Sequence, residues 1–311
     1  MKVVKPITIT TAMVLDSSGV SGDVAYLPYS AATTYAKGVQ RKVDDDTNDI
    51  HMLYESLQDN NLGHDPWSTL GTWWAEVTPL PGWELFDESP STLTEWDLGP
   101  WHGIRKISYT IAPGVLVDTL GLINLNQVLQ VDVSVVTAAE GEIFATSINM
   151  QEEAGIVDFY TFLTSDIILH TDLAVNFPAA IGEITVTLWG AYDYGLSIGC
   201  LVLGKAINIG DTQWGVSLGI TDYSVDEVDQ WGHARLIQGA YARRQEADLE
   251  LDSYLVDHVY RTLSDLRATP ALWIGSELYG ATIAYGRYEH FNVIVAGPAV
   301  SDCALTIKGL V

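Results

Sequence analysis

The residues with the most distinctive chemistry are tyrosines and tryptophans concentrated in residues 26–77. Flat aromatic rings stack on the C–H faces of pyranose sugars, and a few polar groups then fix the orientation of the sugar. Such a site needs one or two rings that keep an exposed face. The candidate carbohydrate-binding residues of this segment are Tyr29, Tyr35, Tyr54, Trp67, Trp73 and Trp74.

The same rings have a second interpretation as the core of a small domain. A folded unit of about 50 residues buries too little surface to be stable without large side chains. The rings that can keep an exposed face are Trp67, Trp74 and Tyr29. The sequence leaves both interpretations open, a core alone or a core with a sugar-binding platform. In either case we expect most of four rings to be packed inside the module: Tyr35, Tyr54, Trp73 and Trp74.

An acidic turn lies within this aromatic region. Residues 39–43 and 50–54 alternate apolar and polar positions, which predicts the two strands of a hairpin on either side of the turn. Several oxygen-bearing residues match the ligand positions of a calcium-binding loop, but Asp49 stands where that loop requires glycine, and no flanking helices are expected. The pattern therefore predicts a solvated turn and no metal site. The matching residues are Asp44, Asp46, Asn48 and Glu55.

No cluster of residues matches a catalytic motif. The seven histidines lack zinc-ligand spacing, and the chain has neither a nucleophile elbow nor a phosphate-binding loop. A glycoside hydrolase would need two carboxyl groups about 5–10 Å apart, and we expect pairs such as Asp222 and Asp226 to lie in turns or on the surface. Cys200 and Cys303 lie in apolar, strand-like stretches, which predicts buried free thiols. We therefore expect neither an enzyme nor a bound cofactor.

The formal net charge of −25, from 40 acidic and 15 basic residues, limits the partners of the chain. A nucleic-acid binder needs a basic face that displaces counterions from phosphate, so the composition argues against this class. An acidic surface that repels DNA would suit a conduit through which DNA slides. No apolar run approaches the roughly 18 residues of a membrane span, and the first residues lack a signal-peptide pattern. We expect no membrane insertion, and assembly in a cytoplasm.

Three arginines stand out because positive charge is scarce in this chain. Arg235, Arg243 and Arg244 are expected to pair with Asp or Glu, either within the chain or across a subunit contact. They are the candidate interface residues. Our hypothesis places Arg243 and Arg244 at an assembly interface.

The elements that position these residues are predicted to be mainly β-strands. Between residues 104 and 203, apolar segments recur at intervals of about ten residues and are separated by turn residues, a spacing typical of an antiparallel, jelly-roll-like sandwich. One helix is predicted near residues 254–267, with Ser253 as its N-cap and Pro270 beyond its end. The predicted strands of the sandwich are 104–111, 114–123, 128–136, 143–148, 167–175, 184–189 and 198–203, and 159–162 is predicted as a short strand or a turn.

Shifts in composition divide the chain into five parts. Residues 1–25 are expected to form an N-terminal strand or arm, and residues 26–78 the small aromatic module. Pro, Gly and acidic residues mark 79–103 as a connector, which aromatic side chains should anchor on the body. A β-sandwich domain at 104–200 and a second β unit with one helix at 201–311 complete the chain. The expected anchors of the connector are Trp83, Phe86, Trp96 and Trp101.

Two sets of motifs give the chain a resemblance to virion proteins of tailed phages. The first set resembles the type-3 chitin-binding kind of module, in the version found in such proteins: Tyr26-Leu27-Pro28-Tyr29, Tyr54-Glu55-Ser56-Leu57, Asn60-Asn61-Leu62-Gly63, Asp65-Pro66-Trp67 and Trp73-Trp74-Ala75-Glu76-Val77. The second set is similar to the C-terminal part of phage tail proteins of the distal-tail kind: Trp214-Gly215-Val216-Ser217, Tyr241-Ala242-Arg243-Arg244, Pro270-Ala271-Leu272-Trp273-Ile274-Gly275 and Cys303-Ala304-Leu305-Thr306-Ile307.

The resemblance implies a structural protein of the virion, held in a symmetric ring of the phage tail or baseplate and assembled in the host cytoplasm. Its expected partners are other tail proteins, further copies of the same chain and, through the aromatic module, host-surface glycan. Linked weak sites in a ring bind more strongly than one site alone. Two other functions stay open, a free carbohydrate-binding adhesin and a cell-wall glycan hydrolase.

Overall fold

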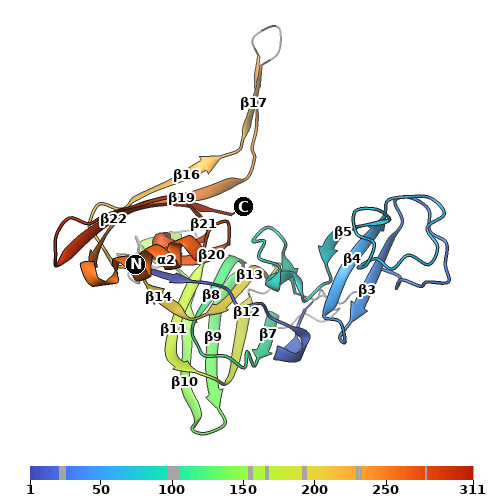
Figure 1. Ribbon diagram of the computed structural model, residues 1–311, viewed down its shortest axis with the longest axis horizontal. Helices are drawn as coiled ribbons and strands as arrows, with labels where there is room; N and C mark the ends of the chain where they lie inside the picture. The colour runs from blue at the N-terminus through green and yellow to red at the C-terminus, as the bar shows by residue number, and fades with distance from the viewer. Residues whose placement is uncertain are drawn as a thin grey trace.

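The structure is a computed structural model, built mainly of antiparallel β-strands (Figure 1). It describes residues 1–20, 26–96, 105–152, 157–164, 168–190, 195–228, 231, 233–276 and 279–310. Three stacked sheets form the body, while a three-stranded sheet and a two-stranded hairpin stand away from it. The predicted mainly β, sandwich-like fold is confirmed. Among the described residues, no helix combines the length and the apolar character needed to cross a bilayer.

Two of the sheets form the sandwich. The outer sheet has the strand order β10–β9–β12–β7–β2, and the middle sheet has the order β11–β8–β13–β6. Their facing sides share one core, to which Val133 contributes from the outer sheet and Leu122 from the middle sheet. The strands are β2 (Val14–Ser18), β6 (Thr94–Glu95), β7 (Arg105–Ile111), β8 (Val117–Asn126), β9 (Val128–Thr137), β10 (Gly141–Asn149), β11 (Leu173–Ala180), β12 (Glu183–Gly190) and β13 (Ser197–Gly204).

The third sheet of the body, the large sheet, covers the other side of the middle sheet. Its path is β14–β1–β20–β21–β22–β19–β15, and β16 also pairs with β19. Val202 of the middle sheet and Leu272 of the large sheet share a second core between the two layers. The strands are β1 (Lys2–Val4), β14 (Ala206–Asn208), β15 (Asp211–Thr212), β16 (Ser217–Asp222), β19 (Tyr241–Asp252), β20 (Ala271–Ile274), β21 (Ile283–Ile294) and β22 (Val300–Gly309).

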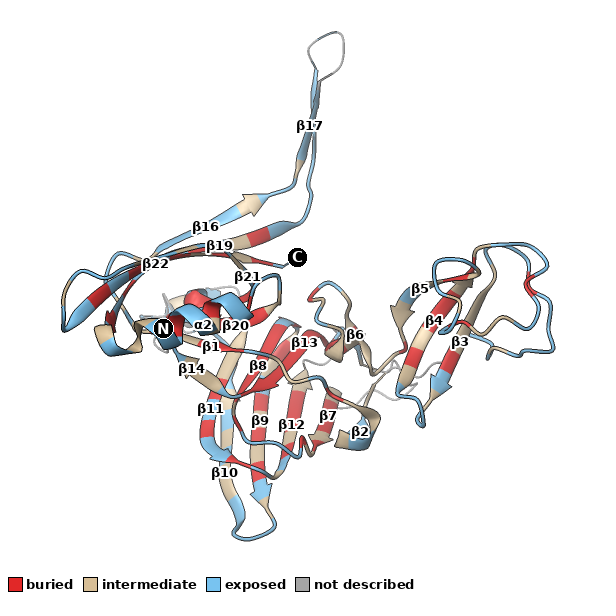
Figure 2. Ribbon diagram, in the orientation of Figure 1, coloured by how far each residue is buried: buried red, intermediate tan, exposed pale blue. Residues whose placement is uncertain are grey.

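Alternation along the central strands lets each of them serve two cores. Successive side chains of a strand point to opposite faces of its sheet. In β13, Leu201 packs into the sandwich core and Val202 into the core shared with the large sheet, and every residue of the strand is buried. In β20, Leu272 faces the middle sheet, whereas Trp273 joins a third core on the far side. The body is therefore continuous through all its layers (Figure 2).

Helix α2 (Val256–Asp265) covers the far face of the large sheet, where Val259 and Leu263 are buried in the third core. The helix predicted near residues 254–267 is confirmed. It follows a short 3-10 turn at Ser253–Leu255. The predicted N-cap role of Ser253 is wrong, because its hydroxyl donates to the carbonyl of Gly297 at 2.7 Å and ties the turn to the loop between β21 and β22.

Two further segments differ from expectation, whereas the leader does not. Residues 159–162 lie in the short helix α1 (Phe159–Thr164), so neither a strand nor a turn forms there. The strand expected at 167–175 is β11, which begins at Leu173. The leader forms the N-terminal strand that the sequence predicts, and β1 lies inside the large sheet between β14 and β20. Val3 and Val4 are fully buried there, on opposite faces of the strand.

Both cysteines are buried free thiols, as predicted. Burial raises the pKa of the Cys200 thiol to about 12 and that of Cys303 to about 11. The thiolate is the reactive form of cysteine, so both side chains remain protonated and unreactive near neutral pH. Their role is therefore packing.

The connector between the module and the sandwich is anchored on the body by aromatic side chains, as predicted. Phe86 and Trp96 pack against the sandwich core, and Leu85, the residue before Phe86, is buried in it. Trp83 contacts the aromatic module instead, as described below. Trp101, also an expected anchor, lies outside the described residues.

The connector also carries a pH-sensitive carboxyl group, Glu84, in the 3-10 turn Glu84–Phe86. Burial, and then the nearby charges of Glu95 and Asp87, raise the pKa of Glu84 from 4.5 to about 7. Between these pH values the folded chain holds a proton that the unfolded chain releases, so stability falls as the pH rises through this window. We expect a lower melting temperature at about pH 8 than at about pH 5.5.

The variant Glu84→Gln should narrow this difference by raising the melting temperature at the higher pH. Glu142→Gln, which changes an exposed carboxyl group at the end of the sandwich, is the control and should leave the difference unchanged. Thermal unfolding followed by circular dichroism measures both. An unaltered difference in Glu84→Gln would contradict the assignment.

Candidate functional site

The aromatic module is a three-stranded antiparallel sheet that stands beside the body (Figure 1). Strands β3 (Gln40–Asp45) and β4 (Ile50–Ser56) form the predicted hairpin, with Val43 opposite Met52. Strand β5 (Trp74–Pro79) pairs with the other edge of β4. The segment before β3 and the segment between β4 and β5 carry most of the other candidate aromatic residues.

Half of the candidate rings form the core of this module. Trp74 is fully buried, and its indole N–H donates to the carbonyl of His64 at 2.8 Å. Tyr35 and Tyr54 are 3% exposed, and burial, with a contribution from Glu76, raises the pKa of Tyr54 to about 12. The expectation that Trp74 keeps an exposed face is therefore wrong. These three rings cannot stack directly on a sugar, because the module needs them to fill its interior.

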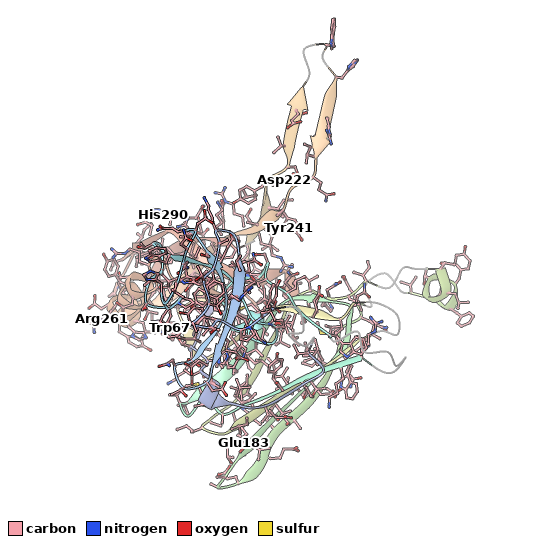
Figure 3. All side chains as sticks on the ribbon, turned by 90° about the vertical axis from the view of Figure 1, so that its right-hand side faces the viewer. Trp67, Glu183, Asp222, Tyr241, Arg261 and His290 are labelled. Atoms are coloured by element: carbon pink, nitrogen blue, oxygen red, sulfur yellow. The ribbon has the colours of Figure 1, made fainter. Side chains whose placement is uncertain are left out.

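The accessible aromatic surface is a rim made by the remaining candidates. Trp67 is 40% exposed and stands edge to face with the half-buried Tyr29, with 6.3 Å between ring centroids. Tyr29 in turn contacts Trp74, and its hydroxyl donates to the carbonyl of His64 at 3.1 Å. Trp73 is half-buried and stacked on the His64 ring at 3.9 Å. Trp67 thus offers the most exposed ring, on the side of the module seen in Figure 3.

The acidic turn of the module is organised by its own hydrogen bonds. Asp45 accepts from the backbone N–H of Thr47 at 2.9 Å and from the Asn48 amide at 2.7 Å, and these bonds lower its pKa. One potential metal-ligand atom from each of Asp44, Asp46 and His51 lies within 4.8 Å of the other two. Among the described residues, this group can therefore hold a divalent cation. Both carboxyl groups are exposed to solvent, as the predicted solvated turn requires.

A small polar joint attaches the module to the body. The His51 ring is stacked on Trp83 of the connector, with 3.9 Å between centroids and an interplanar angle of 1°. Its Nδ1 lies 2.7 Å from the Asp44 carboxylate, and its Nε2 lies 2.6 Å from the Thr11 hydroxyl. The Thr11 backbone N–H donates to Asp49 at 2.6 Å. The joint therefore gives the module a defined orientation relative to the sandwich.

The three candidate interface arginines have different environments. Arg243 forms an ion pair with Asp172 at 2.5 Å and donates to the carbonyl of Ile283 at 3.1 Å, so it joins the large sheet to the segment that leads into β11. Arg244 pairs with Glu246 at 2.8 Å on the surface. Arg235 lies exposed in the projecting hairpin, opposite Glu227. Arg243 is half-buried, whereas Arg235 and Arg244 are exposed, so these two are the more accessible of the three.

The largest feature that the sequence did not reveal is the projecting hairpin, here called the arm. It begins as the paired β16 and β19 at the edge of the large sheet and continues past Asp222 and Tyr241 as the pair β17 (Val225–Val228) and β18 (Ala234–Ile237) (Figure 3). The sequence pattern predicts strands at 215–220 and 234–241. It does not predict whether other parts of the chain cover the faces of the hairpin that these strands form. Exposed large apolar residues of the arm include Leu218, Ile220, Tyr223, Val225, Leu236, Ile237 and Tyr241.

Comparison with known proteins does not assign a family. No protein-family model matches the chain, and no curated protein matches it.

Replacing Trp74 should unfold the aromatic module, whereas replacing Trp67 should not. Truncating a fully buried tryptophan to alanine costs about 3–5 kcal/mol, which a unit of about 50 residues cannot sustain. Limited proteolysis followed by mass spectrometry should show rapid cleavage within residues 26–78 in Trp74→Ala. Trp67→Ala should be cleaved at the wild-type rate. Equal protection of both variants would contradict the assigned core.

The neighbouring arginines offer a matched pair for stability. Arg243→Ala leaves the Asp172 carboxylate, whose side chain is 9% exposed, without its cationic partner and should lower the free energy of unfolding by about 1–3 kcal/mol. Arg244→Ala removes a surface pair and should change it by less than about 0.5 kcal/mol. Chemical denaturation measures both values. Equal losses would show that the Arg243 pair is not a structural contact.

Proposed function

We propose that this chain is a structural subunit of a bacteriophage tail or baseplate, in which copies hold one another in a closed ring. The aromatic module is then displayed at the side of the ring and contacts host-surface glycan weakly through its accessible rim. The exposed apolar arm is the observation that carries this proposal. The order of the sequence motifs, which resembles that of tail proteins, supports the virion setting.

The arm lacks the burial that would keep it stable in isolation. A two-stranded hairpin is marginally stable in water at best, and contiguous exposed apolar side chains mark interaction surfaces. Leu236 is 79% exposed and Ile220 is 63% exposed, although each lies in a regular strand. Figure 2 shows the arm strands coloured mainly as exposed, in contrast to the strands of the body. A partner that covers these side chains would supply the missing burial.

Another copy of the chain is the partner that fits this surface. With a formal net charge of −25, copies repel one another at long range, so their association needs apolar contact of the kind that the arm offers. An arm that reaches a different surface on the next copy makes a head-to-tail contact, which closes into a ring when the rotation is suitable. The aromatic and aliphatic side chains of the arm supply apolar area for such an interface, of which a stable one takes roughly 800 Å² per partner.

The aromatic module adds a weak glycan contact to this scaffold. Its rim exposes Trp67 beside Tyr29, a small platform with space for a single sugar ring. One such contact binds weakly, but several copies in a ring act together through their high effective concentration. Weak individual sites therefore fit a ring better than a single free chain.

Acidic substitutions in the arm should abolish assembly and leave the fold intact. In native mass spectrometry at about 50 μM, the wild-type chain should form a closed oligomer of one stoichiometry, because micromolar contacts are populated at this concentration. The double variant Ile220→Asp/Leu236→Asp should be monomeric, with an unchanged circular dichroism spectrum.

The control is Leu15→Asp. It replaces a different exposed leucine, which is 53% exposed in the edge strand of the outer sheet, with the same acidic residue. It should assemble like the wild type. A wild-type chain that stays monomeric, or a double variant that assembles normally, would contradict the proposed function.

A further inference from the structure

The middle of the outward face of the outer sheet carries two rows of mainly small polar side chains. Cross-strand pairing places Ser147, Asp132, Thr187 and Ser108 in one row across β10, β9, β12 and β7. The next row along the strands is Ala145, Ser134, Thr185 and Thr110. Residues directly opposite in an antiparallel sheet share a face, so both rows lie on the same side.

These small side chains leave an open depression of about 400 Å³. Its floor is set by alanine, serine and threonine, which project less from the sheet than the side chains around them. Trp189 follows Thr187 by two residues in β12 and therefore lies on the same face, beside the depression. The depression is lined by Asp132, Val133, Ser134, Ala145, Thr146, Ser147, Thr185 and Thr187.

The Asp132 carboxylate is held in a fixed position at this site. It accepts from the Trp189 indole N–H at 2.6 Å and from the Gln130 amide at 2.8 Å. Hydrogen bonds from Ser147, Gln130 and Trp189 outweigh the effect of burial and lower its pKa, so the group is charged at neutral pH. The Lys106 ammonium lies 5.2 Å from the centre of the Trp189 ring. An aromatic ring, a carboxylate and hydroxyls thus meet at one edge of the depression.

We propose that this depression is a second glycan site, which takes a neutral saccharide. The Asp132 carboxylate accepts hydrogen bonds from sugar hydroxyls, and the serine and threonine hydroxyls along the floor donate and accept. Trp189 supplies an apolar surface for the C–H face of a ring at the end of the depression. The proposal concerns the sandwich itself, so it does not rest on ring assembly or on the aromatic module.

Other classes of ligand fit this face less well. An anionic ligand is repelled by Asp132 and by the net charge of the chain. An apolar ligand would remove water from the serine and threonine hydroxyls and offer them no hydrogen bonds in its place. A metal ion needs several anionic or neutral oxygen ligands converging on one point, whereas the lining offers one carboxylate that already accepts several bonds.

Two hydroxyl pairs give the face a rigid frame. Ser108 and Thr187 lie 3.0 Å apart through their hydroxyl oxygens, and Thr110 and Thr185 are paired at the same distance. Ser108 and Thr187 are buried, whereas Ser147 and Ala145 are exposed on β10. The β10 side of the depression is therefore the open side, from which a saccharide can approach Asp132.

The test is an NMR titration of the full-length, 15N-labelled chain that follows the indole N–H signal of Trp189. The probes are the neutral tetrasaccharides chitotetraose, cellotetraose and maltotetraose, with tetragalacturonate as the anionic probe. At least one neutral probe should shift this signal with a dissociation constant on the order of 1 mM, as expected of a shallow site. Trp189→Phe identifies the signal by its loss.

Two variants locate the site, and one provides the contrast. Trp189→Ala removes the ring, and Ala145→Trp fills the depression from an exposed position, so each should weaken binding about tenfold or more. The remaining backbone amide shifts report binding in Trp189→Ala and confirm that both variants are folded. Trp67→Ala, in the aromatic module, should bind these probes at the Trp189 site like the wild type.

The proposal is overturned if no neutral probe shifts the Trp189 signal at about 20 mM, a concentration well above the expected constant. It is also overturned if tetragalacturonate alone binds, or if binding is lost in Trp67→Ala and kept in Ala145→Trp. Native mass spectrometry of the same samples separates this result from the proposed function. A ring that forms normally without saccharide binding would remove the glycan site and leave the assembly role standing.

Discussion

The middle sheet is packed on both of its faces, and the rest of the structure depends on this double burial. In β13, Leu201 fills the core of the sandwich and Val202 fills the core beneath the large sheet, so the strand has no solvent face. Gly199 allows the connector to lie close against this strand, because a Cβ atom there would be 2.3 Å from the carbonyl oxygen of Pro90. The sandwich, the large sheet and the connector are therefore one rigid scaffold, against which the other parts are positioned.

The projecting parts differ in how far they can support themselves. The aromatic module has its own small core around Trp74 and an ordered joint at His51 and Trp83, so it can be held at a defined angle. Between Asp222 and Tyr241 the arm is the two-stranded pair of β17 and β18, and none of its described residues belongs to a hydrophobic core. Its strands are regular but its apolar side chains are exposed, a combination that indicates a surface completed by a partner. The module is thus suited to display the proposed glycan-binding rim, and the arm to make the proposed contact between subunits.

Much of the body could be predicted from local sequence, but its long-range pairings could not. The strands of the sandwich have turn residues at their ends, and helix α2 has the regular spacing of Val259 and Leu263, which local patterns detect. The pairing of Val3 with Trp273 depends on a partner about 270 residues away, for which the local pattern carries no signal. Trp67 and Trp74 are alike in sequence terms, and their different exposure follows from which face of the module closes over a core. The arm was not predicted because alternating apolar and polar residues identify a strand but do not show which other elements cover it.

The most direct measurement of the central claim, that the arm joins neighbouring copies, is electron cryo-microscopy of the assembled oligomer. The account predicts a closed ring in which density for residues 217–228 and 234–241 lies against the body of the adjacent copy, with Ile220 and Leu236 covered. A ring held together by other surfaces, with the arm projecting freely into solvent, would contradict it.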